Sequence, residues 1–200
     1  NYIGSLVSRL SNLVLGSKGL MLNCPRSVDF SYLAQHNVVL ELEEIKSGEE
    51  KSFIMGLILS RMAAIIKSEH KKNNHYRHVT LVEEAHRLLS KVEYGDSGAK
   101  KNAVEAFTDL LAEVRKYGEG LVIVDQIPNK LAPDVLKNTN TKIVHRLFAQ
   151  DDKEAVGNTM ALKEEQKEFL SNLNAGRAIM FSDNYGQALQ VQHRKCTLGR

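Results

Sequence analysis

Two adjacent carboxylates, Glu83 and Glu84, are the residues in this chain whose type and position best suit chemistry. They follow the short apolar run from Val79 to Val82, which is typical of a buried strand. Successive side chains on a strand point to opposite faces, so adjacent acids at its end can divide two tasks. One can hold Mg²⁺ through water, while the other orients or deprotonates a water molecule. The pattern is typical of hydrolysis of a nucleoside triphosphate.

A second interpretation of the same segment involves no chemistry. The residues from Ala85 to Leu89 favour a helix, and negative charge stabilises the first turn of a helix. Glu83 and Glu84 would then only connect a strand to a helix with an acidic start. From this segment alone the two interpretations are equally good.

Another apolar strand, from Leu121 to Val124, ends in Asp125 and Gln126. The carboxyl ends of strands line the ligand crevice in open α/β sheets. We therefore expect the strands that end at Glu84 and Gln126 to lie side by side and parallel, with both side chains in one crevice.

The elements that must position these residues alternate between helical and strand patterns, which predicts an α/β fold with a mostly parallel sheet. We expect one domain over residues 1–200. The predicted helices cover residues 2–15 (ended by Gly16 and Gly19), 49–72 and 103–117 (closed by Gly118), with short helices in 128–138 and 151–170. The predicted strands are 37–43, 79–82, 121–124 and 143–148, which contains Arg146, and a hairpin pairs 178–181 with 188–191.

Composition narrows the function classes without choosing one. The net charge of +3 permits nucleic-acid contact but does not require it. No apolar run approaches the roughly 20 residues that span a bilayer. Cys24 and Cys196 form no metal or redox motif, and a reducing cytoplasm is the expected location. The segment that contains His70, His75 and His78 is expected to be an exposed loop, and we prefer this interpretation to a metal site.

Taken together and in order, the motifs resemble those of the HerA-like ATPases, which are akin to FtsK motors and to ATPases of conjugative secretion. The segment from Glu83 to His86 resembles the Walker B ending Asp-Glu-Ala-His, with Glu in place of Asp. Arg115 to Gly118 matches the end of the following helix. Gln126 then closes a strand before Pro128, with Asp125 where the family often has Ser or Thr. A segment similar to 131–143, leading to Arg146, completes a resemblance over about residues 25 to 193.

The resemblance implies a RecA-like core that binds ATP and Mg²⁺. Glu83 would hold Mg²⁺ through water, and Glu84 would polarise the attacking water. Gln126 would sense the γ-phosphate or place that water, because an amide both donates and accepts hydrogen bonds. The alternative for Gln126 is a polar strand cap.

Motors of this family form rings, usually hexamers, with ATP between subunits. An arginine of one subunit then stabilises charge on the neighbour's phosphate. Arg115 is the first candidate and Arg146 the second. The alternatives are a basic residue at a helix C-terminus for Arg115 and a surface charge on an edge strand for Arg146.

The phosphate-binding motif Gly-x-x-x-x-Gly-Lys-Ser/Thr is absent, since the segment from Gly16 to Gly19 has the wrong spacing. We therefore expect the C-terminal part of a longer core, inactive in isolation. The complete protein would be an ATP-driven translocase or helicase on double-stranded DNA, in DNA-end processing, repair or phage defence, with a nuclease partner. The alternatives are a secretion-type ATPase at a membrane and a non-catalytic oligomerisation module.

Overall fold

The computed structural model describes residues 2–95 and 98–194, so Cys196, one of the two cysteines expected to form no metal or redox motif, lies outside the described residues. The chain divides into two compact units, Asn1–Val39 and Leu40–Arg200. The expectation of a single domain over the whole chain stays a prediction.

The first unit is helical. It contains α1 (Tyr2–Leu13), α2 (Gly16–Leu22) and α3 (Phe30–Leu33). The helix predicted from residue 2 is confirmed, but it ends at Leu13, and Gly16 and Gly19 lie in a second helix instead of ending the first. Gly16 has φ +59°, a left-handed conformation that glycine adopts at little cost, and this turns the chain between the two helices.

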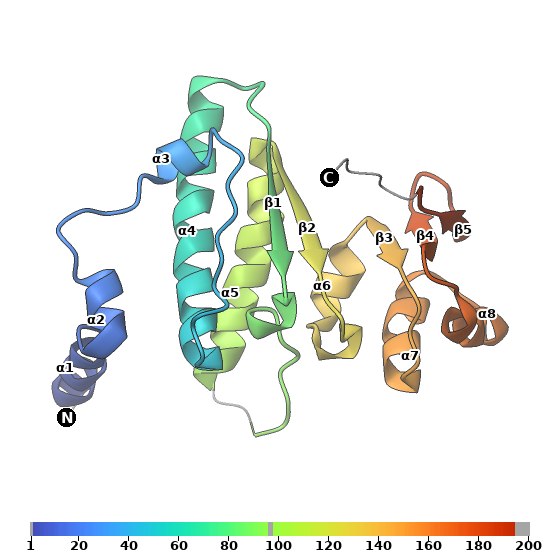
Figure 1. The fold of residues 1–200 in the computed structure, drawn as a ribbon, viewed down its shortest axis with the longest axis horizontal. Helices are drawn as coiled ribbons and strands as arrows, with labels where there is room; N and C mark the ends of the chain where they lie inside the picture. Colours follow the sequence, from blue (N-terminus) through green and yellow to red (C-terminus); the bar gives the residue numbers. More distant parts are fainter. Residues whose placement is uncertain (1, 96–97, 195–200) are drawn as a thin grey trace, which may run out of the picture. The chain divides into compact units, whose positions relative to one another are not determined.

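The second unit begins with two long helices and a parallel strand pair (Figure 1). The helices are α4 (Gly48–Lys72) and α5 (Gly98–Val114), and the strands are β1 (His78–Glu83) and β2 (Glu119–Val124). The 3₁₀ turn η2 (Arg115–Tyr117) follows α5 and ends at Gly118, which has φ +80° as its left-handed cap. The predicted helices over 49–72 and 103–117, and both strands, are confirmed.

One face of the β1–β2 pair packs against α4 and α5. Thr80 and Leu121 line a small space together with Ile66 of α4 and Val114 of α5. The opposite face carries side chains that remain exposed, which include Val79 at 64%. This alternation between a packed and an open face is what the period of two along a strand produces.

A second, antiparallel sheet follows in the order β3-β4-β5, made of β3 (Thr141–Val144), β4 (Arg177–Ser182) and β5 (Leu189–Gln192). It packs with α7 (Gln150–Thr159) and η4 (Leu170–Asn172) around a separate apolar cluster that includes Met160 and Leu170, and α8 (Glu164–Phe169) contacts α7 and η4. The predicted hairpin and both short helices are confirmed.

Helix α6 (Pro133–Asn138) and the turn η3 (Pro128–Lys130) lie between the two sheets in the sequence. Asn129 of η3 joins them to α7: its backbone N–H donates to Asp152, and its side-chain amide donates to Asp151. The predicted loop and short helix in this region are confirmed.

Three expectations about strands are wrong. Residues 37–43 form no strand, and Val39 is 83% exposed there instead of buried in a ladder. Strand β3 ends at Val144, so Arg146 lies outside it. In the described ranges the strands form two sheets, one parallel and one antiparallel, and not one mostly parallel sheet. Short apolar runs look alike in sequence whether they pair parallel, pair antiparallel or stay unpaired.

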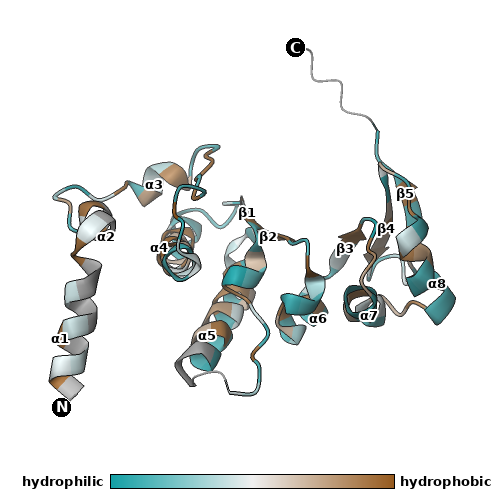
Figure 2. Cartoon of the chain, turned by 60° about the horizontal axis from the view of Figure 1, so that its bottom comes forward, coloured by the Kyte–Doolittle hydropathy of each residue, from teal (hydrophilic) through white to brown (hydrophobic). Residues whose placement is uncertain are grey.

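Helix α8 is coloured mainly as hydrophilic (Figure 2), yet its Lys167 is buried, and so is Lys153 of the neighbouring α7. Lys167 pairs with Glu164 at 2.6 Å, and Lys153 of α7 pairs with Glu168 at 2.8 Å. Both glutamates reach solvent, so each buried ammonium has a partner for its charge.

No helix in the described part of the chain is long and apolar enough to cross a membrane.

Candidate active site at the ends of β1 and β2

The predicted meeting of the two strand ends is confirmed. Strands β1 and β2 are parallel neighbours, and Glu83, the last residue of β1, lies opposite Val124, the last residue of β2. Glu84 is the next residue after β1 and Asp125 the next after β2, and Gln126 follows Asp125 as an exposed residue. The prediction that Gln126 shares a crevice with Glu84 stays a prediction.

Glu84 does not continue the strand. Its backbone is left-handed, with φ 53° and ψ 42°, and it precedes the single 3₁₀ turn η1 (Ala85–Arg87). Its carbonyl accepts the N–H of Arg87 at 3.0 Å, and Ala85, the first residue of the turn, is fully buried. The alternation of strand side chains therefore sets the direction of Glu83, the last residue of β1, but not that of Glu84. The helix predicted after Glu84 is only this short turn.

Asp125 holds the η1 turn in place from the neighbouring strand. Its side chain is 3% exposed, and its Oδ2 accepts the backbone N–H of His86 at 2.8 Å. The ring Nδ1 of His86 lies 2.9 Å from the same oxygen. The other oxygen, Oδ1, accepts the backbone N–H of Ile127 at 2.9 Å. The sequence resemblance marked Asp125 only as a departure from Ser or Thr, so this function was missed.

Two side-chain nitrogens lie near the carboxylate of Glu84. His86 Nε2 and Arg87 Nη2 are each 3.8 Å from Glu84 Oε2. These contacts are longer than hydrogen bonds, and the Glu84 side chain is 40% exposed, so the carboxylate stays accessible to solvent. Glu83 is exposed and has no ion pair with any described residue, which leaves its carboxylate oxygens available for a hard cation such as Mg²⁺.

Arg115 lies at the opposite end of the strand pair, in η2 just before β2. Strand β2 has six residues, so at a rise of about 3.3 Å from one residue to the next its two ends lie about 17 Å apart. Arg146 follows β3, and its guanidinium lies over the ring of Phe148 at 5.1 Å. Both arginines are exposed, and neither forms an ion pair with Glu84 within the described residues.

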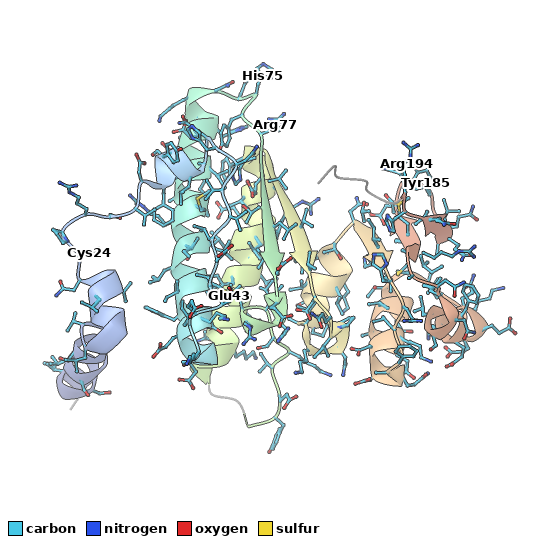
Figure 3. All side chains as sticks on the ribbon, in the orientation of Figure 1. Cys24, Glu43, His75, Arg77, Tyr185 and Arg194 are labelled. Carbon is cyan, nitrogen blue, oxygen red and sulfur yellow. The ribbon has the colours of Figure 1, made fainter. Side chains whose placement is uncertain are left out.

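The histidines of the 70–78 segment do not converge on a metal. His78 Nδ1 pairs instead with Glu119 Oε2 at 2.8 Å, and His70 packs edge-on against Tyr117. Burial, followed by the charge of Glu119, raises the pKa of nearby Tyr76. No group of three or more potential metal ligands occurs in the part of the chain that the structure describes. His75 and Arg77 lie in the connection between α4 and β1 (Figure 3).

No protein-family model matches the chain. The probable DNA double-strand break repair helicase HerA of Methanocaldococcus jannaschii is 30% identical over 171 residues, which is 80% of this chain. The chain is a distant homologue of the HerA helicases. This HerA homologue spans 31% of the length of that relative.

Solved structures agree on the fold of the HerA homologue. VirB4 of Thermoanaerobacter pseudethanolicus matches 97% of this chain and 50% of its own, with a TM-score of 0.70 and 19% identity. The genome packaging NTPase B204 of Sulfolobus turreted icosahedral virus 2, solved with AMPPCP, matches 84% of this chain and 74% of its own, with a TM-score of 0.58 and 14% identity. The α/β arrangement is therefore similar to that of VirB4 and of the NTPase B204.

Proposed function

We propose that this chain supplies the hydrolytic carboxylates and a sensor residue to the ATPase site of a HerA-type DNA translocase or helicase. The observation that carries the proposal is the parallel pairing of β1 and β2, in which Glu83 lies opposite Val124, so that Glu84 and Asp125 follow neighbouring strand ends. Homology to HerA over most of the chain supports the same assignment.

The roles follow from the accessibility and chemistry of each side chain. The exposed Glu83 carboxylate would hold Mg²⁺ through water, and that ion would neutralise charge on the phosphates. Glu84, which leaves the strand in a left-handed conformation, would accept the proton of the attacking water. The Gln126 amide would hold that water or a phosphate oxygen by donating and accepting hydrogen bonds.

The positions of the arginines support a site shared between subunits. Arg115 lies at the far end of β2 from Glu84, so it would act on the nucleotide of a neighbouring subunit and not on its own. Arg146 is the second candidate for this role. Double-stranded DNA as substrate, a homo-hexameric ring, a nuclease partner and a cytoplasmic location belong to the same proposal.

The test is DNA-stimulated ATP hydrolysis by the full-length protein. Glu84→Gln should retain ATP binding and lose turnover by about 100-fold or more, because removing one essential acid–base group typically costs between 10²- and 10⁴-fold. Glu165→Gln is the matched control, since Glu165 is exposed on α8 and forms no ion pair with a described residue. Normal turnover by Glu84→Gln would assign water activation to another residue.

A further inference from the structure

The turn that follows β2 is held by the first turn of helix α7. The backbone N–H of Asn129 donates to Asp152 Oδ1 at 2.9 Å, and the side-chain amide of Asn129 donates to Asp151 Oδ2 at 2.8 Å. Both distances lie within the ordinary range for hydrogen bonds, and each joins an N–H donor to a carboxylate oxygen. Asn129 is therefore fixed through its backbone and through its side chain by one neighbouring helix.

The burial of Asp152 is a feature that the helix by itself does not explain. A carboxylate in the first turn of a helix is stabilised by the helix dipole, but this requires no burial, and Asp151 is exposed in the same turn. Asp152 is only 8% exposed and forms no ion pair with a described residue. Because a carboxylate that is buried without a cation destabilises the fold unless it is hydrogen-bonded, its position against Asn129 indicates a role in holding that residue.

The same turn carries Gln126 at its start. The next residue, Ile127, donates its backbone N–H to Asp125 Oδ1 at 2.9 Å, and the N–H of Lys130 donates to the Ile127 carbonyl at 3.0 Å. The turn is thus closed by its own hydrogen bond, and carboxylates accept two of its backbone N–H groups. Gln126 is itself exposed, so its position depends on the backbone that carries it.

We propose that Asp152, together with Asp151, is a positioning residue for Gln126. The inference rests on the proposed role of Gln126 as the residue that holds the attacking water or a phosphate oxygen. Asp152 fixes Asn129, which lies in η3, and η3 fixes the backbone that carries Gln126. A displacement of about 1 Å in a reacting group can cost about 100-fold in rate, so a small shift of this turn is sufficient to slow hydrolysis. A helix that packs on the antiparallel sheet thereby supports a residue at the end of the parallel strand pair.

Two substitutions of Asp152 separate its hydrogen bond from its charge. Asp152→Asn keeps an oxygen that can accept the N–H of Asn129, whereas Asp152→Ala removes it. We expect Asp152→Ala in the full-length protein to lower kcat for ATP hydrolysis by about 10- to 100-fold, with the KM for ATP nearly unchanged. Asp152→Asn should recover most of that loss. Asn129→Ala keeps the backbone bond and loses only the bond to Asp151, so it should lower kcat less and provides the same test should Asp152→Ala fail to fold.

The dependence on Gln126 distinguishes positioning from a general loss of structure. Asp152→Ala should cause no further loss of kcat when it is combined with Gln126→Ala, because the residue that Asp152 positions is then already absent. Asp134→Ala is the matched control, since Asp134 also lies in the first turn of a helix, α6, but is exposed. Additive losses in the double variant, equal losses with Asp152→Asn and Asp152→Ala, or a kcat of Asp152→Ala within about twofold of wild type would overturn the proposal.

A measurement without turnover keeps this inference separate from the proposed function. In hydrogen–deuterium exchange of the full-length protein, the peptide that covers residues 126–131 should exchange faster in Asp152→Ala than in wild type or Asp152→Asn, while the peptide that covers β1 should not change. Unchanged exchange of residues 126–131 in Asp152→Ala would overturn the inference. Faster exchange in a protein whose wild type has no ATPase activity would support the hold of α7 on the turn and refute the proposed function alone.

Discussion

The left-handed backbone of Glu84 predicts an unusual order of stability for substitutions at this position. Glu84 has φ 53°, a region that costs an ordinary L-residue roughly 1–2 kcal/mol and costs glycine almost nothing. Glu84→Ala and Glu84→Gly both remove the carboxylate and its contacts with His86 and Arg87. The difference between these two variants therefore isolates the backbone.

The expected difference follows from two opposing contributions. Relief of the left-handed strain favours glycine by roughly 1–2 kcal/mol, while the greater freedom of glycine in the unfolded chain offsets about 0.4–1 kcal/mol. Glu84→Gly should thus be more stable than Glu84→Ala by about 0.5–1 kcal/mol. For a chain of 200 residues this difference corresponds to about 1–4 °C in Tm.

Urea denaturation of the purified variants, followed by circular dichroism, measures the difference directly. The control pair is Glu165→Ala and Glu165→Gly in helix α8, where glycine should be less stable by about 1 kcal/mol. The reasoning is refuted if alanine equals or exceeds glycine in stability at residue 84 while the control pair shows the ordinary order. Both Glu84 variants should lack hydrolysis, so the strained conformation would be kept for activity at the expense of stability.

Two further predictions concern packing and pH. Gly56→Ala should destabilise the fold by about 1–3 kcal/mol, because a Cβ there would lie 2.6 Å from Phe107 Cζ. The measurement is thermal unfolding, and the control is Gly4→Ala, since Gly4 has open space around it. The hydrogen bond from Lys153 holds the pKa of Glu168 below its ordinary value. This pair therefore stabilises the fold fully when the pH is above that ordinary pKa, and the stabilisation is lost as the pH falls through the lowered pKa. When Tm is measured between about pH 6 and pH 3, Glu168→Gln should lose less Tm on acidification than the wild type. An equal fall of Tm in the two proteins would contradict this prediction.

Much of the secondary structure was predictable from local sequence. The apolar periodicity of residues 49–72 and 103–117 predicted the two long helices, and Gly118 predicted the end of the second. The failures concern pairing. Residues 37–43 had the composition of a strand but find no ladder, because a strand requires a neighbour that the segment itself does not specify.

The candidate site shows the same division. The sequence pointed to Glu83, Glu84 and Gln126 as residues at strand ends, because an apolar run followed by acids or amides is a local pattern. The pairing of His86 with Asp125, which is 39 residues away in the chain, was not among the expectations from the sequence. A contact over such a distance leaves no periodic signal in a single sequence.

The sequence by itself determined which residues could do chemistry and which segments would be helical, since composition, spacing and turn residues act over a few positions. Only the tertiary structure decided that β1 and β2 are neighbours, that Glu84 turns out of its strand, and that Asp125 holds His86. These features depend on hydrogen bonds and packing between segments that meet only after the chain has folded, and local preference cannot specify them.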